Sequence, residues 1–206
     1  MMSAMDPPLH ERVYDGLKKD YLAGHFVPGK RIDMQALATR YRSSKTPVRE
    51  AAFILVGEGL LTHHADGGFL VPMLAPAELA ELLSWHMQLM LTLLSNLRES
   101  AMRAALRRNT TVDVQPSQVA LAHLAAEIFV SLADASGNPQ ASTQVRRLNE
   151  RLHYSRIADA ADPAGTEKEL ITFSNLDVVS LQKATRRRIE TYHMRKIAHL
   201  QKVMQT

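Results

Sequence analysis

Hydrophobic residues recur at helical spacing along most of this chain, and strand-like alternation is confined to one short stretch. Near the N-terminus, Val13, Leu17 and Tyr21 stand four residues apart, which places them on one face of a helix. We expect this helix over residues 9–22, because Gly24 follows it in the position of a C-terminal glycine. The first predicted element is therefore an amphipathic helix whose apolar face turns to a core.

A second, shorter helix is expected after the turn at Pro28-Gly29. Asp33 is suited to cap it, since a side-chain carboxylate can accept the first unpaired backbone N–H groups of a helix. The helix should reach Tyr41, and a turn of sequence Arg-Ser-Ser follows it at residues 42–44.

The third helix has two possible starts. Ser44 as the cap would put the next two residues in the first turn, whereas Thr46 as the cap would put Pro47 at the first helical position. The sequence leaves both open. The helix should end near Gly57 and Gly59.

The stretch LLTHHADGGFLV, residues 60–71, is where strands are expected. Ala65-Asp66-Gly67-Gly68 is a hairpin turn signal between two short apolar runs. Three helices followed by a two-stranded ribbon make a winged helix-turn-helix. In such a motif the helix after the turn can lie in a DNA major groove with its N-terminal side chains facing base edges.

The stretch VPMLAPAE reads as a linker because Pro72 and Pro76 bracket it. We therefore expect a DNA-binding domain over 1–75 and an all-helical domain over 76–206. Helices are suggested at about 76–107 (open to division in two), 117–135, 139–160, 165–180 and 181–204. The predicted fold class is mostly α, a winged helix-turn-helix followed by an antiparallel helical bundle.

Composition excludes several classes of protein. The chain has 206 residues and no cysteine, which rules out disulfides and thiolate metal sites. The longest apolar stretch, 79–97, contains Glu81, His86 and Asn96 and is too polar for a membrane span. With no visible secretory signal, a cytoplasmic protein is expected. We find no nucleophile elbow, phosphate loop or HExxH motif, so an enzyme is not expected.

Positive charge is concentrated in two places. The net charge is +4, and residues 40–49 hold four cations and no acid. This run coincides with the turn and the start of the third helix, which suits contact with phosphates. The second cluster, in residues 183–202, is interpreted most simply as a solvated helix face.

The segments PGKRI, LATRYRSSKTPVREA, EGLL and GGFLV resemble the winged helix of the GntR family of bacterial transcription regulators. Ser44 to Ala51 is the most specific part, and the resemblance covers residues 9–75. The helical remainder, in which LADASGNP closes a helix, is similar to the FCD type of ligand-sensing domain in that family.

The resemblance implies that the start of the third helix contacts an operator and that the hairpin tip reaches the adjacent minor groove. Lys45 and Arg49 stand four apart and share a helix face, and either can donate to guanine O6 and N7. For His63-His64, a groove or phosphate contact and a solvent-exposed loop are equally good interpretations. The candidate DNA-binding residues are Arg42, Ser44, Lys45, Thr46, Arg49, His64 and Gly67.

Within the same helix the chain departs from the family pattern at Ala52, Phe53 and Ile54. Phe53 and Ile54 are expected to form an exposed apolar pair. Packing against a neighbouring domain or subunit would explain such a pair, and a tendency to aggregate is the alternative.

The departure in the helical domain concerns metal binding. Domains of the FCD type often hold a metal with one Asp and three His, and the first two of these positions fall on Ala125 and Phe129 here. The third falls near Ile171, and only His193 fits the pattern. We therefore predict no metal and no cofactor, because a zinc-type site needs about three protein ligands. His123 and Glu127 lie on a different face and are interpreted as a solvated pair.

In the absence of a metal ion, a carboxylate effector would have to bind a cationic side chain. The chain offers Arg98, Arg103, Arg146, Arg151, His153 and Arg156. Our candidate effector-binding residues are Arg98, Arg146, His153 and His193, although a structural role in the core is the favoured interpretation of His193.

The predicted function is a dimeric transcription regulator that binds a pseudo-palindromic operator, with two recognition helices about 34 Å apart. A small organic effector, a carboxylate for preference, would control it through the helical domain. The alternative is a constitutive dimeric DNA-binding protein whose helical domain has lost effector and metal binding.

Overall fold

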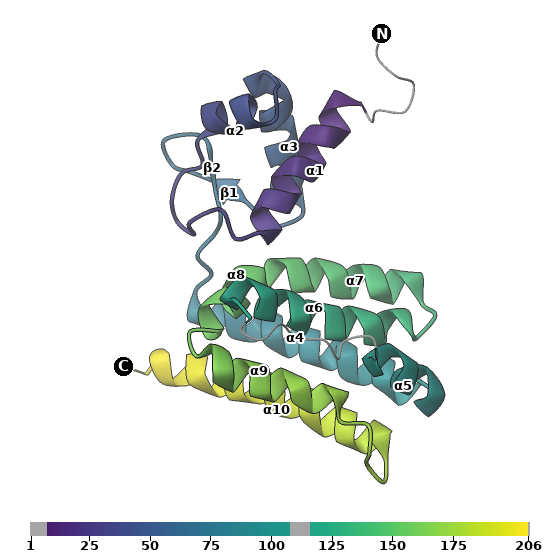
Figure 1. Cartoon of the computed structure of the whole chain (residues 1–206). Coiled ribbons are helices and arrows are strands. Elements are labelled where there is room, and N and C mark those ends of the chain that lie inside the picture. The colour runs from purple at the N-terminus through teal and green to yellow at the C-terminus, as the bar shows by residue number, and fades with distance from the viewer. Residues whose placement is uncertain (1–7, 108–115, 206) are drawn as a thin grey trace. The chain divides into compact units, whose positions relative to one another are not determined.

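The computed structural model describes residues 8–107 and 116–205 and shows a mainly helical chain with one small sheet (Figure 1). It divides into two compact units, one ending at Met73 and the next beginning at Leu74. The elements are, in chain order, α1 (Leu9–Leu22), α2 (Met34–Arg40), α3 (Lys45–Gly57), β1 (Thr62–His63), β2 (Phe69–Leu70), α4 (Pro76–Ser95), α5 (Glu99–Arg107), α6 (Gln118–Asp134), α7 (Pro139–Arg151), α8 (His153–Asp159), α9 (Pro163–Ile171), the 3-10 helix η1 (Thr172–Ser174) and α10 (Leu181–Val203). The predicted fold class, a winged helix-turn-helix followed by a helical bundle, is confirmed.

In the N-terminal unit, α1 and α2 both pack against α3. The predicted apolar face of α1 is buried, and Val48 and Leu55 of α3 are fully buried with it. Asp33 caps α2 as expected, its carboxylate accepting hydrogen bonds from the backbone N–H groups of Gln35 and Ala36. The three-helix core thus follows from local signals in the sequence.

A buried carboxylate fixes α2 to α1. Asp20 of α1 is 6% exposed and accepts a hydrogen bond of 2.6 Å from the Tyr41 hydroxyl. Arg40 lies 3.1 Å from the same carboxylate and His25 lies 3.2 Å from it. A buried carboxylate needs such partners, since an unpaired one is costly to desolvate. This cluster therefore sets the position of the helix that precedes the basic turn.

The wing is the predicted hairpin. β1 and β2 are antiparallel with His63 opposite Phe69, and Arg31 adds an isolated bridge to Leu70. The turn between the strands uses Gly67 at a φ of +83°, a conformation that glycine adopts without the steric cost met by other residues.

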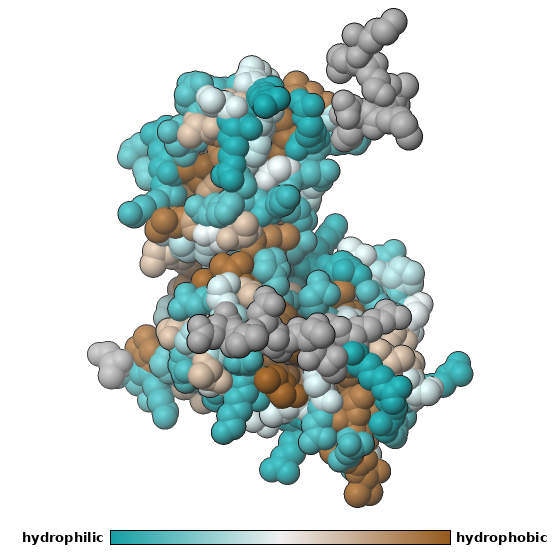
Figure 2. Space-filling model, viewed as in Figure 1, coloured by the Kyte–Doolittle hydropathy of each residue, from teal (hydrophilic) through white to brown (hydrophobic). Residues whose placement is uncertain are grey.

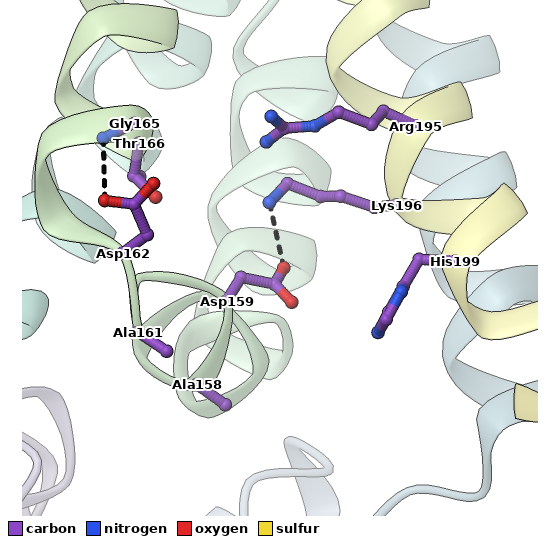
Figure 3. Close-up of a pocket in the computed structure, with 9 residues that line it drawn as sticks. All are labelled: Ala158, Asp159, Ala161, Asp162, Gly165, Thr166, Arg195, Lys196 and His199. Carbon is purple, nitrogen blue, oxygen red and sulfur yellow. Dashed lines mark hydrogen bonds and ion pairs between the residues drawn. The ribbon is translucent and has the colours of Figure 1, made fainter.

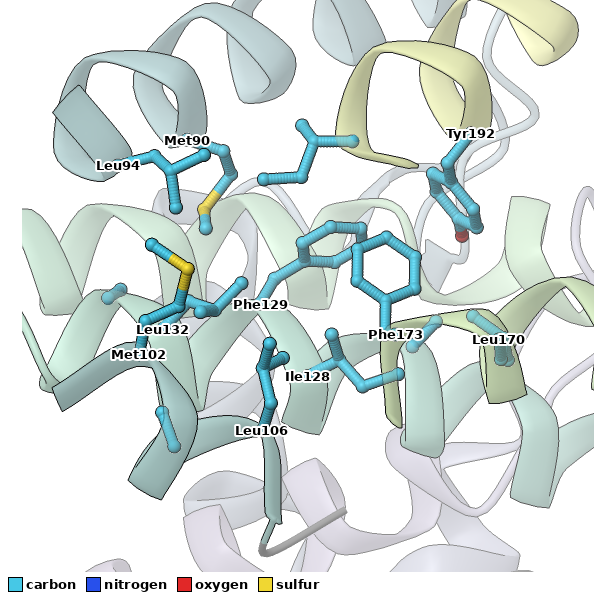
Figure 4. Close-up of a cluster of buried hydrophobic side chains, with 14 of the residues drawn as sticks. Met90, Leu94, Met102, Leu106, Ile128, Phe129, Leu132, Leu170, Phe173 and Tyr192 are labelled. Carbon is cyan, nitrogen blue, oxygen red and sulfur yellow. The ribbon is translucent and has the colours of Figure 1, made fainter. Parts of the chain in front are cut away.

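The second unit is a bundle in which α4 packs along α10, and α6 packs against α7, α8 and α9 (Figure 1). Its largest buried cluster is centred on Phe129 of α6, which meets Phe173 edge to face at 5.9 Å (Figure 4). The side chain of Tyr192, from α10, closes the same cluster.

The division that the sequence left open in the first predicted helix of this unit occurs after Ser95, where Leu97 turns into the core. Two other predicted helices differ from the observed ones. The helix predicted at 139–160 breaks at Leu152, a fully buried residue that ends α7 and begins α8. The helix predicted at 165–180 stops with η1, because Asn175 accepts the N–H of Asp177 in a local turn.

The C-terminal basic cluster is not only a solvated face. On the face drawn in Figure 2, hydrophilic residues predominate and hydrophobic ones form scattered patches. Lys196 was expected in solvent, yet it is 7% exposed and its ammonium lies 2.9 Å from Asp159. An ammonium buried in this way needs an anionic partner such as Asp159, because an unpaired buried charge is costly to desolvate. Within 8–107 and 116–205, no helix combines the length and the apolar character that crossing a membrane would need.

Candidate functional site

The turn into α3 shows which of the two possible caps is used. Ser44 is the N-cap, with extended backbone angles of φ −84° and ψ 172°, so Lys45 and Thr46 form the first turn. The Ser44 hydroxyl makes no capping hydrogen bond to the helix. Its hydroxyl and the first N–H groups of α3 therefore remain suited to an anion such as a phosphate oxygen.

The amphipathic character of α3 turns its polar residues outward. Val48, Ala51 and Leu55 are buried against the other helices, whereas Lys45, Thr46 and Arg49 are exposed. Within the described part of the chain, neither Lys45 nor Arg49 takes part in an ion pair. The predicted spacing thus places two cations on one accessible face.

Arg42, in the turn between α2 and α3, has an unusual backbone. It is exposed and has a φ of +50°, the one positive φ of a non-glycine residue among those described. A side chain at such a φ is disfavoured by contact between Cβ and the backbone. The exposed side chain of Arg42 is free to reach a phosphate. The strained backbone of this residue is a feature that the sequence did not indicate.

At the wing, the two candidate residues have different surroundings. Gly67 is exposed at the tip, with open space around it. His64 is half-buried, and its Nδ1 accepts the backbone N–H of Asp66 at 3.1 Å. One ring nitrogen of His64 therefore shapes the turn, which leaves only Nε2 for an outside partner.

The predicted apolar pair on α3 is exposed, at 50% for Phe53 and 52% for Ile54. Phe53 nevertheless has a partner within its own unit. Its ring meets Phe69 edge to face at 5.1 Å and lies 5.7 Å from the ring of His63. Packing against the wing accounts for Phe53, a contact different from the domain or subunit neighbour that we expected.

In the helical unit, three of the four positions matched to the family's metal ligands are filled by apolar side chains. Ala125 and Phe129 are buried in the core, Ile171 is 48% exposed, and its neighbour Leu170 is buried. Among the described residues there is no group of three His, Asp or Glu placed to hold a metal. His123 and Glu127 are both exposed. That the protein binds no metal stays a prediction.

His193 lies in a buried pair of histidines that the sequence did not reveal. Its Nδ1 is 2.7 Å from the carbonyl oxygen of Ile189, and its Nε2 is 2.8 Å from Nδ1 of His86, on α4. Because a carbonyl can only accept, His193 carries its proton on Nδ1 and accepts from His86 at Nε2. Burial lowers the pKa of His193 to about 3 and that of His86 well below its usual value, so both rings are neutral.

The four candidate effector-binding residues do not form one site. Arg98 is exposed between α4 and α5, and Arg146 pairs on the surface with Asp134. His153 and His193 are buried. Arg98 and Arg146 therefore lie apart from the two buried histidines, and effector binding by any of the four stays a prediction. Beside the histidine pair lies Arg156 instead, a 3% exposed residue whose charge acts on both rings.

An open pocket of about 420 Å³ lies between α8, α9 and α10. Asp159 and Lys196 project into it and form the ion pair drawn in Figure 3, with His199 and Arg195 on the same side as Lys196. Acidic and basic side chains both line this pocket, so its walls carry charges of both signs.

Comparison with known proteins agrees with this geometry. Residues 9–71 match the family model of bacterial regulatory proteins of the gntR family. The Nta operon transcriptional regulator of Aminobacter aminovorans is 30% identical over 149 residues, 66% of this chain and 67% of that protein. The uncharacterised HTH-type transcriptional regulator YdhC of Bacillus subtilis is 27% identical over 165 residues, 73% of this chain and 70% of that protein.

A solved structure has a similar fold. A candidate GntR transcriptional regulator from Rhodococcus sp. RHA1 superposes with a TM-score of 0.74 at 17% identity, covering 93% of this chain and 96% of that one. The two sequence relatives above are regulators rather than enzymes. This chain belongs to the GntR family of bacterial regulatory proteins and is a DNA-binding transcription regulator.

Proposed function

We propose that the chain acts as a homodimer that binds a pseudo-palindromic operator and responds to a small carboxylate effector held in its FCD-type helical unit. The observation that carries the DNA-binding part is the start of α3. Ser44, Lys45, Thr46 and Arg49 are all exposed there, around helix N–H groups that have no helical partner.

Each of these groups suits a different part of DNA. Arg49 and Lys45 can donate to guanine O6 and N7, and a planar guanidinium does so with two parallel hydrogen bonds. Ser44 and Thr46 suit phosphate oxygens, as does the Arg42 guanidinium in the preceding turn. The wing tip at Gly67, with Nε2 of His64 beside it, would reach the neighbouring minor groove.

We infer dimerisation from the two-fold symmetry of a pseudo-palindromic operator. A single short helix reads only a few base pairs, and two copies related by a two-fold axis double the site. The residues assigned to the N-terminal DNA-binding domain, 1–75, would then be joined by a helical domain, 76–206, that dimerises and binds the effector.

The test begins with selection of bound fragments from the source genome, followed by titration of the best fragment at several salt concentrations. An inverted repeat bound at about 10⁻⁸ M or tighter supports the proposal. Binding that ignores sequence and collapses with salt would contradict it, because phosphate contact alone behaves in that way. Sedimentation of the full chain with and without the fragment measures whether two copies bind.

The second candidate function is constitutive DNA binding by a dimer with no effector. The burial of apolar side chains at two of the family's metal positions, Ala125 and Phe129, favours it, since packed apolar side chains leave no room for a ligand there. An effector that binds the native protein must raise its melting temperature, so a screen of small acids that yields no such rise would favour this alternative.

A further inference from the structure

The interior of the helical unit contains an arginine without a counterion. Arg156, on α8, is 3% exposed, and Nε, Nη1 and Nη2 of its guanidinium have no hydrogen-bond partner among the described residues. Its carbon Cζ lies 5.5 Å from the centre of the Phe129 ring. Burial lowers the pKa of Arg156, while the nearby Tyr192 hydroxyl and the Asp159 carboxylate favour its charged form.

Neither of those neighbours satisfies the guanidinium. Asp159 is engaged by Lys196 at 2.9 Å, and Tyr192 makes no hydrogen bond of normal geometry with Arg156. An arginine does not lose its proton in a protein, so it cannot avoid the cost of desolvation by becoming neutral. Five donors on a buried, planar cation therefore lack an acceptor, and a carboxylate fits such a group with two parallel hydrogen bonds.

Acceptors without a donor occur in the same cluster. Nδ1 of His86 donates to His193, so Nε2 of His86 carries a lone pair, and this buried atom has no partner among the described residues. The amide oxygen of Asn149 is unpartnered as well, although its nitrogen donates to the carbonyl of Ala126. The His86 ring packs on Phe129 at 4.9 Å, the same ring that Arg156 faces.

We propose that Arg156, His86 and Asn149 form a metal-independent site for a small hydroxy-carboxylate, with the carboxylate on Arg156 and the hydroxyl donating to His86 or Asn149. A ligand ammonium could also donate to these acceptors, but it would lie beside the cation of Arg156. A hydroxyl has no such repulsion. This inference rests on the proposed effector control and names the chemistry of its site.

The pocket of Figure 3 is the route of entry that we propose for this site. Arg156 and Asp159 stand three apart on α8, and His193 and Lys196 stand three apart on α10. Residues three apart lie on one face of a helix, so the Asp159–Lys196 ion pair of the pocket shares its helix faces with Arg156 and His193. A ligand entering from the pocket would meet this pair first.

The first test follows the Nε–Hε signal of Arg156 by NMR in the full chain, labelled with ¹⁵N-arginine. The signal is assigned by its loss in Arg156→Met. Acetate supplies the carboxylate alone, and glycolate adds one hydroxyl. We expect the Arg156 signal to shift saturably with both, with glycolate binding at least about tenfold more tightly. The exposed Arg146 serves as an internal reference that should not respond saturably.

The second test measures the melting temperature with glycolate for three proteins: wild type, Arg156→Met and Arg146→Met. Replacement of an unpaired buried charge by an apolar side chain of similar length should preserve the fold. The saturable rise should disappear in Arg156→Met and persist in Arg146→Met. In His86→Phe, glycolate should lose its advantage over acetate.

Three results would overturn the site. One is an Arg156 signal that stays still, or drifts linearly as Arg146 does, up to 100 mM of either acid, about the range in which weak anion binding is seen. Another is binding that disappears with EDTA, since that would require a metal. The last is an equal response to acetate and glycolate, which would remove the hydroxyl from the proposal.

These tests use no DNA, so their failure is separate from failure of the proposed function. An unresponsive Arg156 removes this site and leaves effector control by another site possible. Saturable glycolate binding that does not change operator affinity would support the site and contradict effector control through it.

Discussion

Nδ1 of His86 lies 2.8 Å from Nε2 of His193, and this hydrogen bond joins α4 to α10 through the buried core of the helical unit. The arrangement requires a neutral His193, because a proton on its acceptor nitrogen Nε2 would break the hydrogen bond, and burial lowers the pKa of His86 as well. The pKa of His193 is about 3 in the folded chain, against an ordinary value of 6.5. Between these values the unfolded chain binds a proton that the folded chain does not.

We therefore expect the helical unit to lose stability as the pH falls from about 6.5 towards 4, and to be insensitive to pH in this respect above about 7. Each histidine contributes a slope of up to about 1.4 kcal/mol per pH unit. Urea titrations followed by the fluorescence of Trp85, the single tryptophan of the chain, report on this unit. His193→Gln should reduce the slope and the exposed His199→Gln should not. A slope unaltered by His193→Gln would contradict the assignment.

The contact between Phe53 and Phe69 should stabilise the wing. Truncation of Phe53 to alanine removes an edge-to-face pair, and we expect the N-terminal unit to lose about 0.5–1.5 kcal/mol of unfolding free energy. Ile54→Ala is the matched control, because Ile54 is equally exposed and should change stability by less than about 0.5 kcal/mol. Native-state hydrogen exchange of the buried amides of α1 and α3 measures both. Equal losses of unfolding free energy in the two variants would contradict a stabilising role for the contact between the Phe53 and Phe69 rings.

The positive φ of Arg42 predicts a gain in stability on replacement by glycine. Relief of the left-handed strain should raise the unfolding free energy of the N-terminal unit by about 1 kcal/mol relative to Arg42→Ala, which keeps the strain and also lacks the cation. Hydrogen exchange again gives the difference. If Arg42 contacts a phosphate, the two variants should weaken DNA binding to the same extent. A glycine variant no more stable than the alanine variant would show that the turn carries no strain.

How far the sequence could predict the structure depends on whether the determining contacts are local. The ends of α1, the Asp33 cap and the hairpin at Gly67 each follow from signals within a few residues, and all were found where expected. The break at Leu152 has no glycine or proline to mark it, and the residue that separates the two helices is a fully buried leucine.

The interior of the helical unit was hidden for the same reason. His86 and His193 are 107 residues apart, and no spacing rule connects them. Arg156 was counted among the available cations but not selected, because the sequence does not show which arginines face inward. Only the fold reveals that Arg156 is buried and that Asp159 is engaged by Lys196. Buried polar residues that look like surface residues are thus the ones that sequence reasoning misses.

Arg49 provides the sharpest test of DNA reading. If its guanidinium contacts a guanine, Arg49→Ala should cost about 1–3 kcal/mol of operator binding and relax the base preference at one position of each half-site. Arg12→Ala removes an exposed arginine of α1, outside the helix-turn-helix, and should change affinity much less. Competition between operator variants with single base changes measures the preference directly. If affinity instead falls evenly across all variants, with a smaller dependence on salt, Arg49 contacts phosphate, and Lys45 becomes the base-reading candidate of α3.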